Sequence, residues 1–589
     1  MQPMHARGFH YLSRRGLNQV QPPLPYIHLK NHQLEDLDVG LKQSDWVAAA
    51  ADQVIAEGKR RGGAPLVCAS GVSPSGPIHL GNLREIMVPH FVADEIRRRG
   101  LECRHLLSWD DYDRLRKVPA GVPASFSEHI GRPLTAVPDP CGEHENWAEH
   151  FKAPLRSALA QLGVEVDEIS QTQMYTSGAY REQIVHAMRH RQQIDGVLGR
   201  YRTKKAEVEV EQDEEDLAAA SAGGYYPYRP YCEVCGRDST AVTSFDDAST
   251  QMRYRCECGH SGDFALSETD GGKLVWKVDW PMRWAFEGVT FEAGGVDHSS
   301  PGSSFTVGSQ LVREVFDGLP PSYLGYSFVG ISGMAKMSSS KGGVPTPIDI
   351  LEVLEPAVLR WLYNRRQPRQ SFQIALDQEI LRLYDEWDAL ERKVAAGTAT
   401  DLDVAVRARS VGPAAGPLPS TPRPLPFRTL ASVADVAAGD PEQTLRILRD
   451  FTVEEPLASL AESQPRLDRA QTWVTTYVPA EDRTQVRAEP DRARLEQLAP
   501  AQREALKLLL DGLDEHWSLD GLTSLVYGVP KIQAGLPLDA PASPELKAAQ
   551  RELFVLLYEL LVGRDTGPRL PTLLLALGAD RIRSLLTVA

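Results

Sequence analysis

Residues 74–82, PSGPIHLGN, combine small residues with side chains that can donate hydrogen bonds to phosphate. His79 supplies a ring nitrogen and Asn82 supplies an amide, and both groups can bind phosphate oxygens. Gly76 and Gly81 have no side chain, so a ligand can approach the backbone closely there. A lone histidine beside a helix is more often structural, so this loop by itself indicates a phosphate site without establishing one.

A second segment, KMSSSK at residues 336–341, favours the same chemistry. Lys336 can place a cation on a phosphate chain, and Ser338 and the two serines after it offer hydroxyls and leave backbone N–H groups accessible. Lys341 adds a second positive charge or is simply solvated. A flexible connection between domains has no use for the two lysines or for Met337. The segment therefore predicts a triphosphate clamp.

The elements that must position these loops form an α/β pattern. Residues 64–71 are a short apolar run typical of a buried strand. Apolar spacing over residues 83–100 predicts a helix that ends at three arginines and a glycine, and residues 101–109 predict another strand. Strand, loop, helix and strand make one parallel crossover unit. We expect a doubly wound parallel, Rossmann-like catalytic domain over residues 45–350, with the first loop at the carboxyl end of a strand, where such sheets bind ligands.

The rest of the chain divides by composition. Residues 1–44 show no sustained periodicity and are expected to be an N-terminal extension, which can be disordered. An insertion into the catalytic domain is expected over about 110–274. Residues 351–426 are predicted to hold helices that contact an RNA stem and then a proline-rich linker over 397–426. Helical patterns follow one another over residues 427–589, which predicts an all-α domain.

Composition and charge limit the class of protein. Apolar residues make up 42% and charged residues 24% of the 589 residues, as in soluble globular proteins. No apolar run reaches the roughly 18–20 residues that span a bilayer, and the first residues lack the apolar segment of a secretion signal. We expect a cytoplasmic protein with no membrane contact. The net charge of −15 excludes a basic coat over the whole surface, so nucleic-acid contacts must come from local patches.

Four of the seven cysteines form two close pairs, Cys232 with Cys235 and Cys256 with Cys258. Thiolates at this spacing can complete the tetrahedral shell of a structural zinc ion. We therefore expect a zinc knuckle over about residues 228–262, with His260 as an alternative to Cys258. The other three cysteines are scattered, which does not indicate a disulfide framework.

The two phosphate loops, His-x-Gly-Asn and then Lys-Met-Ser-x-Ser, resemble the two signature motifs of class I aminoacyl-tRNA synthetases. Longer segments resemble the archaeal-type class I lysyl-tRNA synthetases: SGVSPSGPIHLGNLREI, SWDDYDRLRKVP, VDWPMRWAFEGVTFEAGGVDH and GMAKMSSSKG. The similarity runs from about Trp46 to GPRLPTLLLALG at residues 567–578. Asn82 stands where many relatives have a second histidine, and Ser73 stands in place of a family threonine.

The resemblance implies an ATP-dependent ligase that joins L-lysine to tRNA(Lys) through a lysyl-adenylate and transfers the lysyl group to the 2′-hydroxyl of the terminal adenosine. Bound tRNA is expected to be required for the first step. The implied cofactors are ATP, Mg²⁺ and Zn²⁺, and no stable protein partner is inferred. Two alternatives stay open: a class I synthetase for another amino acid, and a non-catalytic RNA-binding paralogue.

The resemblance also assigns residues. The implied catalytic residues are His79, Asn82, Lys336 and Ser338. The implied ATP-binding residues are Pro74, Gly76, His79, Gly81, Asn82, Lys336, Met337, Ser338, Ser339 and Ser340. The implied lysine-binding residues are Gly71 and Ser73 at the α-amino end, and Trp276, His298 and Tyr326 around the side chain. Residues 276–298 are rich in aromatic rings and carboxylates, Asp279 and Asp297 among them, which suits an alkylammonium group.

The same resemblance implies a second zinc site, and the spacing of four arginines predicts an RNA patch. The implied metal ligands are Asp139, Glu143, His144 and His150, with Cys141 as an alternative to Glu143 and an empty site as a further alternative. The predicted RNA contacts are Arg360, Arg365, Arg366 and Arg369, which helical spacing is expected to bring partly to one side beside the acceptor stem. An ordinary exposed helix face is the alternative. The all-α domain resembles an anticodon-binding helical bundle.

Overall fold

The computed structural model describes residues 45–202, 220–221, 224–299, 303–332, 344–437, 439–452, 455–541 and 543–587. The N-terminal extension lies outside the described residues, and so do the second-loop residues Lys336, Met337, Ser338, Ser339, Ser340 and Lys341. The predictions made for them therefore stay predictions.

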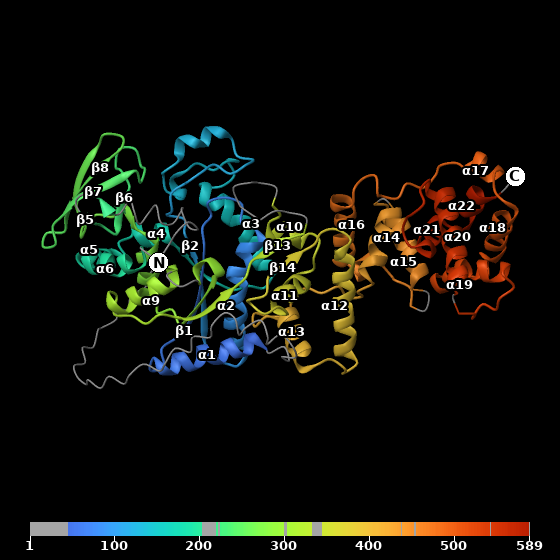
Figure 1. The fold of residues 1–589 in the computed structure, drawn as a ribbon, viewed down its shortest axis with the longest axis horizontal. Helices are drawn as coiled ribbons and strands as arrows, with labels where there is room; N and C mark the ends of the chain where they lie inside the picture. The colour runs from blue at the N-terminus through green and yellow to red at the C-terminus, as the bar shows by residue number, and fades with distance from the viewer. Residues whose placement is uncertain are drawn as a thin grey trace, which may run out of the picture. The chain divides into compact units, whose positions relative to one another are not determined.

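A five-stranded sheet lies at the centre of the catalytic region (Figure 1). Its strands, in spatial order, are β12 (Ser322–Tyr326), β11 (Phe291–Gly295), β1 (Leu66–Val72), β2 (Cys103–Trp109) and β3 (Asp167–Ser170). Every neighbouring pair is parallel, which confirms the predicted α/β class. The strand order reverses between β1 and β11, and ligands bind at such a switch point in open parallel sheets.

Helices cover both faces of this sheet. They are α1 (Trp46–Arg60) and α2 (Leu80–Arg98) on one face, and α8 (Trp276–Glu287) and α9 (Ser304–Glu314) on the other. Side chains alternate between the faces along each strand. On β1, Cys68 therefore packs with the α2 side, whereas Val67 and Ala69 pack with the α8 side. The two sides are named the α2 face and the α8 face below.

The predicted insertion is not wholly separate from the sheet, because its residues 167–170 form the edge strand β3. That strand is short and polar, so the sequence contains no apolar run there that would predict it. The remaining elements of the insertion are η2 (Ala124–His129), η3 (Leu134–Ala136), α3 (Trp147–Gln161), α4 (Gln171–Thr176), α5 (Arg181–Arg189), α6 (Arg191–Arg202), β4 (Ala220–Ser221), β5 (Gly224–Tyr225), β6 (Tyr228–Pro230), β7 (Thr240–Phe245), β8 (Gln251–Cys256), β9 (Ser261–Ala265) and β10 (Gly272–Leu274). Strands β7, β8 and β9 form an antiparallel sheet, and β6 pairs with β10, which leads into α8.

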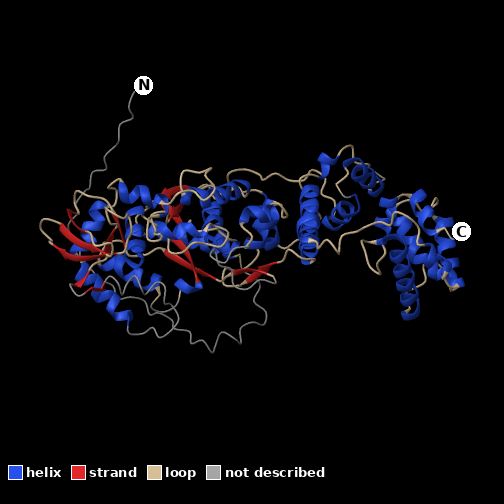
Figure 2. Cartoon of the chain, turned by 90° about the horizontal axis from the view of Figure 1, so that it is seen from above, coloured by secondary structure: helices blue, strands red, loops and turns tan. Residues whose placement is uncertain are grey.

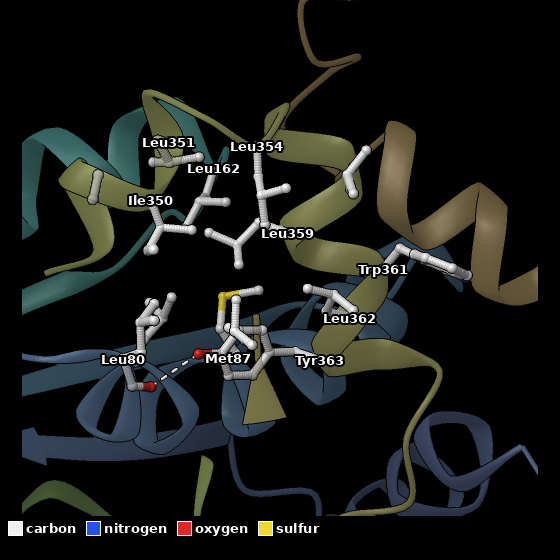
Figure 3. Close-up of a cluster of buried hydrophobic side chains, with 14 of the residues drawn as sticks. Leu80, Met87, Leu162, Ile350, Leu351, Leu354, Leu359, Trp361, Leu362 and Tyr363 are labelled. Atoms are coloured by element: carbon white, nitrogen blue, oxygen red, sulfur yellow. Dashed lines mark hydrogen bonds between the residues drawn. The ribbon is translucent and has the colours of Figure 1, made fainter. Parts of the chain in front are cut away.

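The segments on both sides of the second phosphate loop pack against α2. They are β13 (Val329–Ile331), which pairs with β14 (Phe372–Ile374), and the helices α10 (Pro347–Leu351) and α11 (Pro356–Asn364). The short helix η4 (Val296–His298) lies elsewhere, between β11 and α9. Figure 3 shows Ile350 of α10 and Leu362 of α11 gathered around Leu80 and Met87 of α2. The hydroxyl of Tyr363 donates to the carbonyl of Leu80 at 2.9 Å. The start of α2, which follows the first phosphate loop, is thus bonded to α11, which follows the second phosphate loop.

The predicted linker over residues 397–426 is wrong in its first half, because helix α13 (Asp401–Val411) lies there. Arg409 of this helix forms ion pairs with Asp45 at 2.8 Å and Glu95 at 2.9 Å, and so fastens α13 to the catalytic domain. The prolines that suggested a linker all follow the helix, where the chain forms no regular element before Phe427.

The C-terminal region is helical, as predicted (Figure 2). Its elements are α12 (Glu379–Ala395), α14 (Phe427–Ala437), α15 (Pro441–Phe451), η5 (Leu460–Ser463), α16 (Arg466–Tyr477), α17 (Arg492–Glu496), α18 (Pro500–Gly512), α19 (Leu519–Gln533), α20 (Pro544–Val562), α21 (Leu570–Leu577) and α22 (Ala579–Leu586). The described part of residues 427–587 contains no strand. None of the helices described in this structure has the length and apolarity that crossing a bilayer requires.

Candidate active site

His79 ends the first loop as the N-cap residue of α2. Its Nδ1 accepts a hydrogen bond from the backbone N–H of Gly81 at 3.1 Å, and Asn82 Oδ1 accepts one from the backbone N–H of His79 at 3.3 Å. This reciprocal pair is a capping box. Because Nδ1 is an acceptor, the proton of the neutral imidazole lies on Nε2. Burial lowers the pKa of His79, which favours that neutral form.

Capping therefore leaves two donors for a ligand, the Nε2–H of His79 and the amide nitrogen of Asn82. Both belong to the first turn of a helix of 19 residues, where the macrodipole and the free backbone N–H groups favour negative charge. The loop follows β1, at the switch point of the sheet. The arrangement is suited to binding phosphate oxygens.

Arg84, one turn further along α2, fixes the orientation of this helix. Its side chain is buried and donates to the carbonyls of Ser327 at 2.7 Å, Gln370 at 3.0 Å and Gln367 at 3.1 Å. The guanidinium also lies 5.2 Å from the ring centre of Phe372. These contacts hold the first turn of α2 against β14 and the segment before it.

The other predicted residues of the first loop lie between β1 and α2. Pro74 and Gly76 are buried, while Gly71 and Ser73 are half-buried. A Cβ atom added to Gly71 would lie 3.9 Å from a carboxylate oxygen of Asp110. Gly71 therefore faces the same region as Asp110, which follows β2.

Two of the three residues predicted around the lysine side chain share one cavity. Trp276 and His298 line one part of a cavity of about 220 Å³. The rest of its lining is mostly charged, with three carboxylates and four cationic side chains: Asp110, Asp113, Asp238, Arg114, Arg116, Arg229 and Lys273. Trp276 stacks on Trp280, with ring centres 5.2 Å apart and planes at 17°, and Trp280 meets His298 edge-on at 5.8 Å. These contacts make an aromatic wall on the α8 face.

Tyr326, the third residue, points to the other face of the sheet. It is the last residue of β12, paired with Gly295, and its hydroxyl donates to Glu85 of α2. It is not among the residues that line the cavity with Trp276. The sequence analysis missed Glu85, although it lies only three residues beyond Asn82 and therefore about one helical turn along α2.

Asp279 is not available for a substrate ammonium group, because it belongs to an internal ion network. It is fully buried and pairs with Arg283 and, at 3.6 Å, with Lys273. Arg283 also pairs with Asp110 at 2.7 Å. The side chain of Asp297 lies outside the described residues. The network joins the strand that leaves the insertion to the helix that carries the aromatic wall.

The family model described as tRNA synthetases class I (K) matches residues 44–410, which include every element of this site. The chain belongs to this family. It is 62% identical over 569 residues to the lysine–tRNA ligase of Streptomyces coelicolor, covering 92% of this chain and 98% of the relative. The lysine–tRNA ligase of Pyrococcus horikoshii is 33% identical over 550 residues, covering 90% and 97% of the two chains. That of Treponema pallidum is 30% identical over 557 residues, covering 93% and 99%.

The cysteine pairs of this class I (K) synthetase converge as predicted. The four Sγ atoms of Cys232, Cys235, Cys256 and Cys258 all lie within 4.8 Å of one another. The separations Cys232–Cys258 and Cys235–Cys256 are 3.7 Å and 3.6 Å, close to the edge of about 3.8 Å of a tetrahedron with Zn–S bonds of about 2.3 Å. His260 is not part of the cluster, because its Nε2 binds Glu233 at 2.7 Å. The geometry fits four-thiolate zinc ligation.

A second cluster of possible ligands contains Asp139, Cys141, His144 and His150. The Cys141 Sγ lies 3.4 Å from Nδ1 of His144 and 3.3 Å from Nδ1 of His150. Glu143 is exposed and outside the cluster. The choice of Glu143 as fourth ligand is therefore wrong, since the turn directs the Cys141 thiol toward the histidines.

The predicted RNA role of Arg360 is wrong. Its side chain is fully buried, and it donates to the carbonyls of Leu162 at 2.9 Å and Arg409 at 2.8 Å. The expected arrangement along one helix is also wrong, because α11 ends at Asn364, before the other three arginines.

The other three arginines differ in how firmly they are held. Arg365 stacks 3.8 Å from the ring centre of Trp361 and pairs with Glu386 at 2.8 Å. Arg366 lies 5.7 Å from the ring centre of Phe372, and Arg369 is exposed.

Proposed function

We propose that this protein activates L-lysine with ATP as a lysyl-adenylate and transfers the lysyl group to the 2′-hydroxyl of the terminal adenosine of tRNA(Lys). Membership in the class I (K) family, and the names of relatives that align over nearly the whole chain, support the substrate pair. The observation that carries the activation step is the capping box of α2, because it leaves the Nε2–H of His79 and the amide of Asn82 for phosphate.

In the activation step, a carboxylate oxygen of lysine attacks the α-phosphorus of ATP. The bond between this phosphorus and the oxygen that bridges it to the β-phosphorus breaks, and pyrophosphate leaves. The carboxylate is already ionised, so no general base is needed. Catalysis is then positioning and charge stabilisation. His79 and Asn82 donate to phosphate oxygens as charge redistributes, and Lys336 with Ser338 binds the departing pyrophosphate. Mg²⁺ accompanies the ATP.

Lysine selection is assigned to the cavity on the α8 face. An indole face attracts an ammonium group and packs against methylenes, which Trp276 and the neighbouring His298 offer. Gly71 and Ser73, at the end of β1, are assigned to the α-amino end. Tyr326 is left out of this slot, because its side chain points to the α2 face, where its hydroxyl donates to Glu85.

Zinc is assigned to both ligand clusters. The four-thiolate cluster has no open position, so its zinc stabilises the small β7–β9 insertion and does not take part in the reaction. A second zinc would be held by Asp139, Cys141, His144 and His150, and it would link the turn before α3 to the first turn of that helix. The exposed Arg369 and half-buried Arg366, together with Arg365, are proposed to contact the tRNA acceptor stem, and residues 427–589 the anticodon.

Amino-acid-dependent exchange of pyrophosphate into ATP, measured with each amino acid and with or without tRNA(Lys), tests the proposal. We expect exchange with lysine alone among the amino acids, and only when tRNA is present. Exchange with another amino acid and not with lysine would show that this other amino acid is the substrate. Tight tRNA binding without exchange for any amino acid would support a non-catalytic RNA-binding protein.

A further inference from the structure

One buried carboxylate holds two tryptophans of the α8 face. Glu292, the second residue of β11, is 5% exposed. Its Oε1 accepts a hydrogen bond from Nε1 of Trp280 at 2.9 Å, and its Oε2 accepts one from Nε1 of Trp284. The two indoles lie one turn apart on α8, so a single side chain of the sheet fixes the rotation of both rings.

Trp280 connects this carboxylate to the cavity on the α8 face. It stacks on Trp276 at 5.2 Å and touches His298 edge-on at 5.8 Å. Trp276 and His298 line the cavity, whereas Glu292 does not. Glu292 therefore lies behind the aromatic wall, on the side away from the ligand.

Packing alone does not explain a carboxylate at this position. Burying a charged group is costly unless it is paired, and within the described part of the chain no lysine or arginine forms an ion pair with Glu292. Arg283 of the same helix pairs with Asp110 and Asp279 instead. Burial raises the pKa of Glu292 to about 7, against the two indole hydrogen bonds, which lower it. An apolar side chain would leave the two buried indole N–H groups without a partner, but a neutral acceptor would satisfy them at lower cost than a carboxylate. The negative charge is therefore the feature that needs an explanation.

We propose that Glu292 is a positioning residue for lysine recognition. It holds Trp280 so that Trp276 and His298 form the wall of the lysine slot, and its negative charge behind that wall favours an alkylammonium side chain over an uncharged one. This inference rests on the proposed lysine-activating function.

Replacement of Glu292 by glutamine tests the role at about pH 8, above the pKa of the carboxyl group. Glutamine keeps the size and one acceptor oxygen, but it removes the charge and turns an N–H₂ group toward one indole N–H. In tRNA-dependent pyrophosphate exchange, we expect the KM for lysine to rise about tenfold, the loss expected when one of two opposite charges about 10 Å apart is removed at an effective dielectric constant of about 20. The KM values for ATP and tRNA should stay within about twofold, because the phosphate donors lie on the α2 face.

A second readout separates recognition from general loosening of the fold. L-Norleucine has the four side-chain carbons of lysine but lacks the terminal ammonium group, so its inhibition constant divided by the KM for lysine measures selection for that group. We expect this ratio to fall in Glu292→Gln. A fold defect would instead raise all three KM values and lower the melting temperature.

Glu287→Gln is the matched control. Glu287 is also on α8, and burial likewise raises its pKa to about 7, but its carboxylate accepts from the hydroxyl of Tyr180 at 3.0 Å rather than from the tryptophans of the wall. The charge of Glu287 also raises the pKa of Glu292, so removing it keeps Glu292 ionised at about pH 8, and the KM for lysine should be unchanged there. If Glu292→Gln does not fold, Trp280→Phe removes the same hydrogen bond while keeping an aromatic ring, and it should shift the lysine KM in the same direction.

An unchanged lysine KM in both Glu292→Gln and Trp280→Phe would overturn the role of Glu292. So would equal rises in the KM values for lysine and ATP. Failure of the proposed function looks different, because the wild-type protein would then show no lysine-dependent exchange at all.

Discussion

The two faces of one parallel sheet hold their functional groups by different means. On the α2 face, His79 and Asn82 are fixed by hydrogen bonds to backbone atoms within three residues of each other. On the α8 face, Trp276 and His298 are fixed by ring stacking and, through Trp280, by a carboxylate of the sheet. The first arrangement is local in the chain, whereas the second depends on how helix and strand pack. We infer that the α2 face controls the rate of activation and the α8 face the choice of amino acid.

The largest effect is expected from His79→Asn. Asparagine is a good N-cap residue, so the helix stays capped while the Nε2–H donor is lost. Loss of one preorganised donor to developing charge lowers kcat by about 10²- to 10³-fold. The KM for lysine should change little. Pyrophosphate exchange with tRNA present measures both constants, and a raised lysine KM at unchanged kcat would contradict the division between the faces.

Trp276→Ala should give the opposite pattern. Removing one ring of the wall costs methylene packing and the attraction of the indole face for the ammonium group, so the lysine KM should rise about ten- to a hundredfold. The KM for ATP should stay close to that of the wild type. Trp473→Phe is a useful control for the loss of a tryptophan, because Trp473 lies far along the chain and donates to the carbonyl of Leu376. An equal rise in the ATP KM would show that the faces do not act separately.

The parts that local patterns decide could be predicted from the sequence. The apolar run of β1 and the spacing along α2 placed the first loop between a strand and a helix. The three-residue separation of His79 and Asn82 is itself the signal of an N-cap and its partner. The cysteine pairs likewise lie in short turns, and their Sγ atoms meet.

The parts that depend on packing were missed. Apolar spacing does not show that α11 is buried on every side, so Arg360 was taken for an RNA contact, although it satisfies carbonyls inside the fold. The prolines beyond position 412 led us to predict a linker that included the residues of α13, although tertiary contacts of Arg409 hold this helix in place. Glu292 had one signal, a charged residue between Phe291 and Ala293 in an apolar strand, which requires a buried partner.

Loss of zinc should act on the α8 face and leave the phosphate donors of the α2 face unaffected. Cys235→Ser removes one thiolate of the four-thiolate cluster and should lower bound zinc by one equivalent. Because Tyr231, next to Cys232, lines the same cavity as Trp276 and His298, we expect the KM for lysine to rise several-fold, by up to about tenfold, while the KM for ATP is unchanged. Metal analysis beside aminoacylation kinetics measures both effects.

The second cluster supplies the matched pair for that experiment. Cys141→Ser should release the other equivalent of zinc, and Glu143→Gln should release none, because Glu143 lies outside the cluster. Zinc loss in Glu143→Gln with retention in Cys141→Ser would reverse the assignment of the fourth ligand.

The smallest effect concerns stability on the α8 face. Burial raises the pKa of Glu287 from 4.5 to about 7, so between these values the folded protein binds more protons than the unfolded chain. The contribution of this group to stability therefore falls as pH rises through that window. Glu287→Gln does not titrate, so its melting temperature relative to the wild type should be higher at about pH 8 than at about pH 5. A difference that is constant with pH would show that Glu287 ionises normally, and a difference of the opposite sign would show that its pKa is lowered in the folded protein.

The most direct test of the division between the faces is a crystal structure with a non-hydrolysable lysyl-adenylate analogue. We predict a phosphate-derived oxygen of the analogue within about 3.2 Å of His79 Nε2, and the lysyl methylenes against the ring of Trp276. The division would be contradicted if the phosphate position lay against the α8 face, or if the lysyl side chain ran along the α2 face without touching Trp276 or His298.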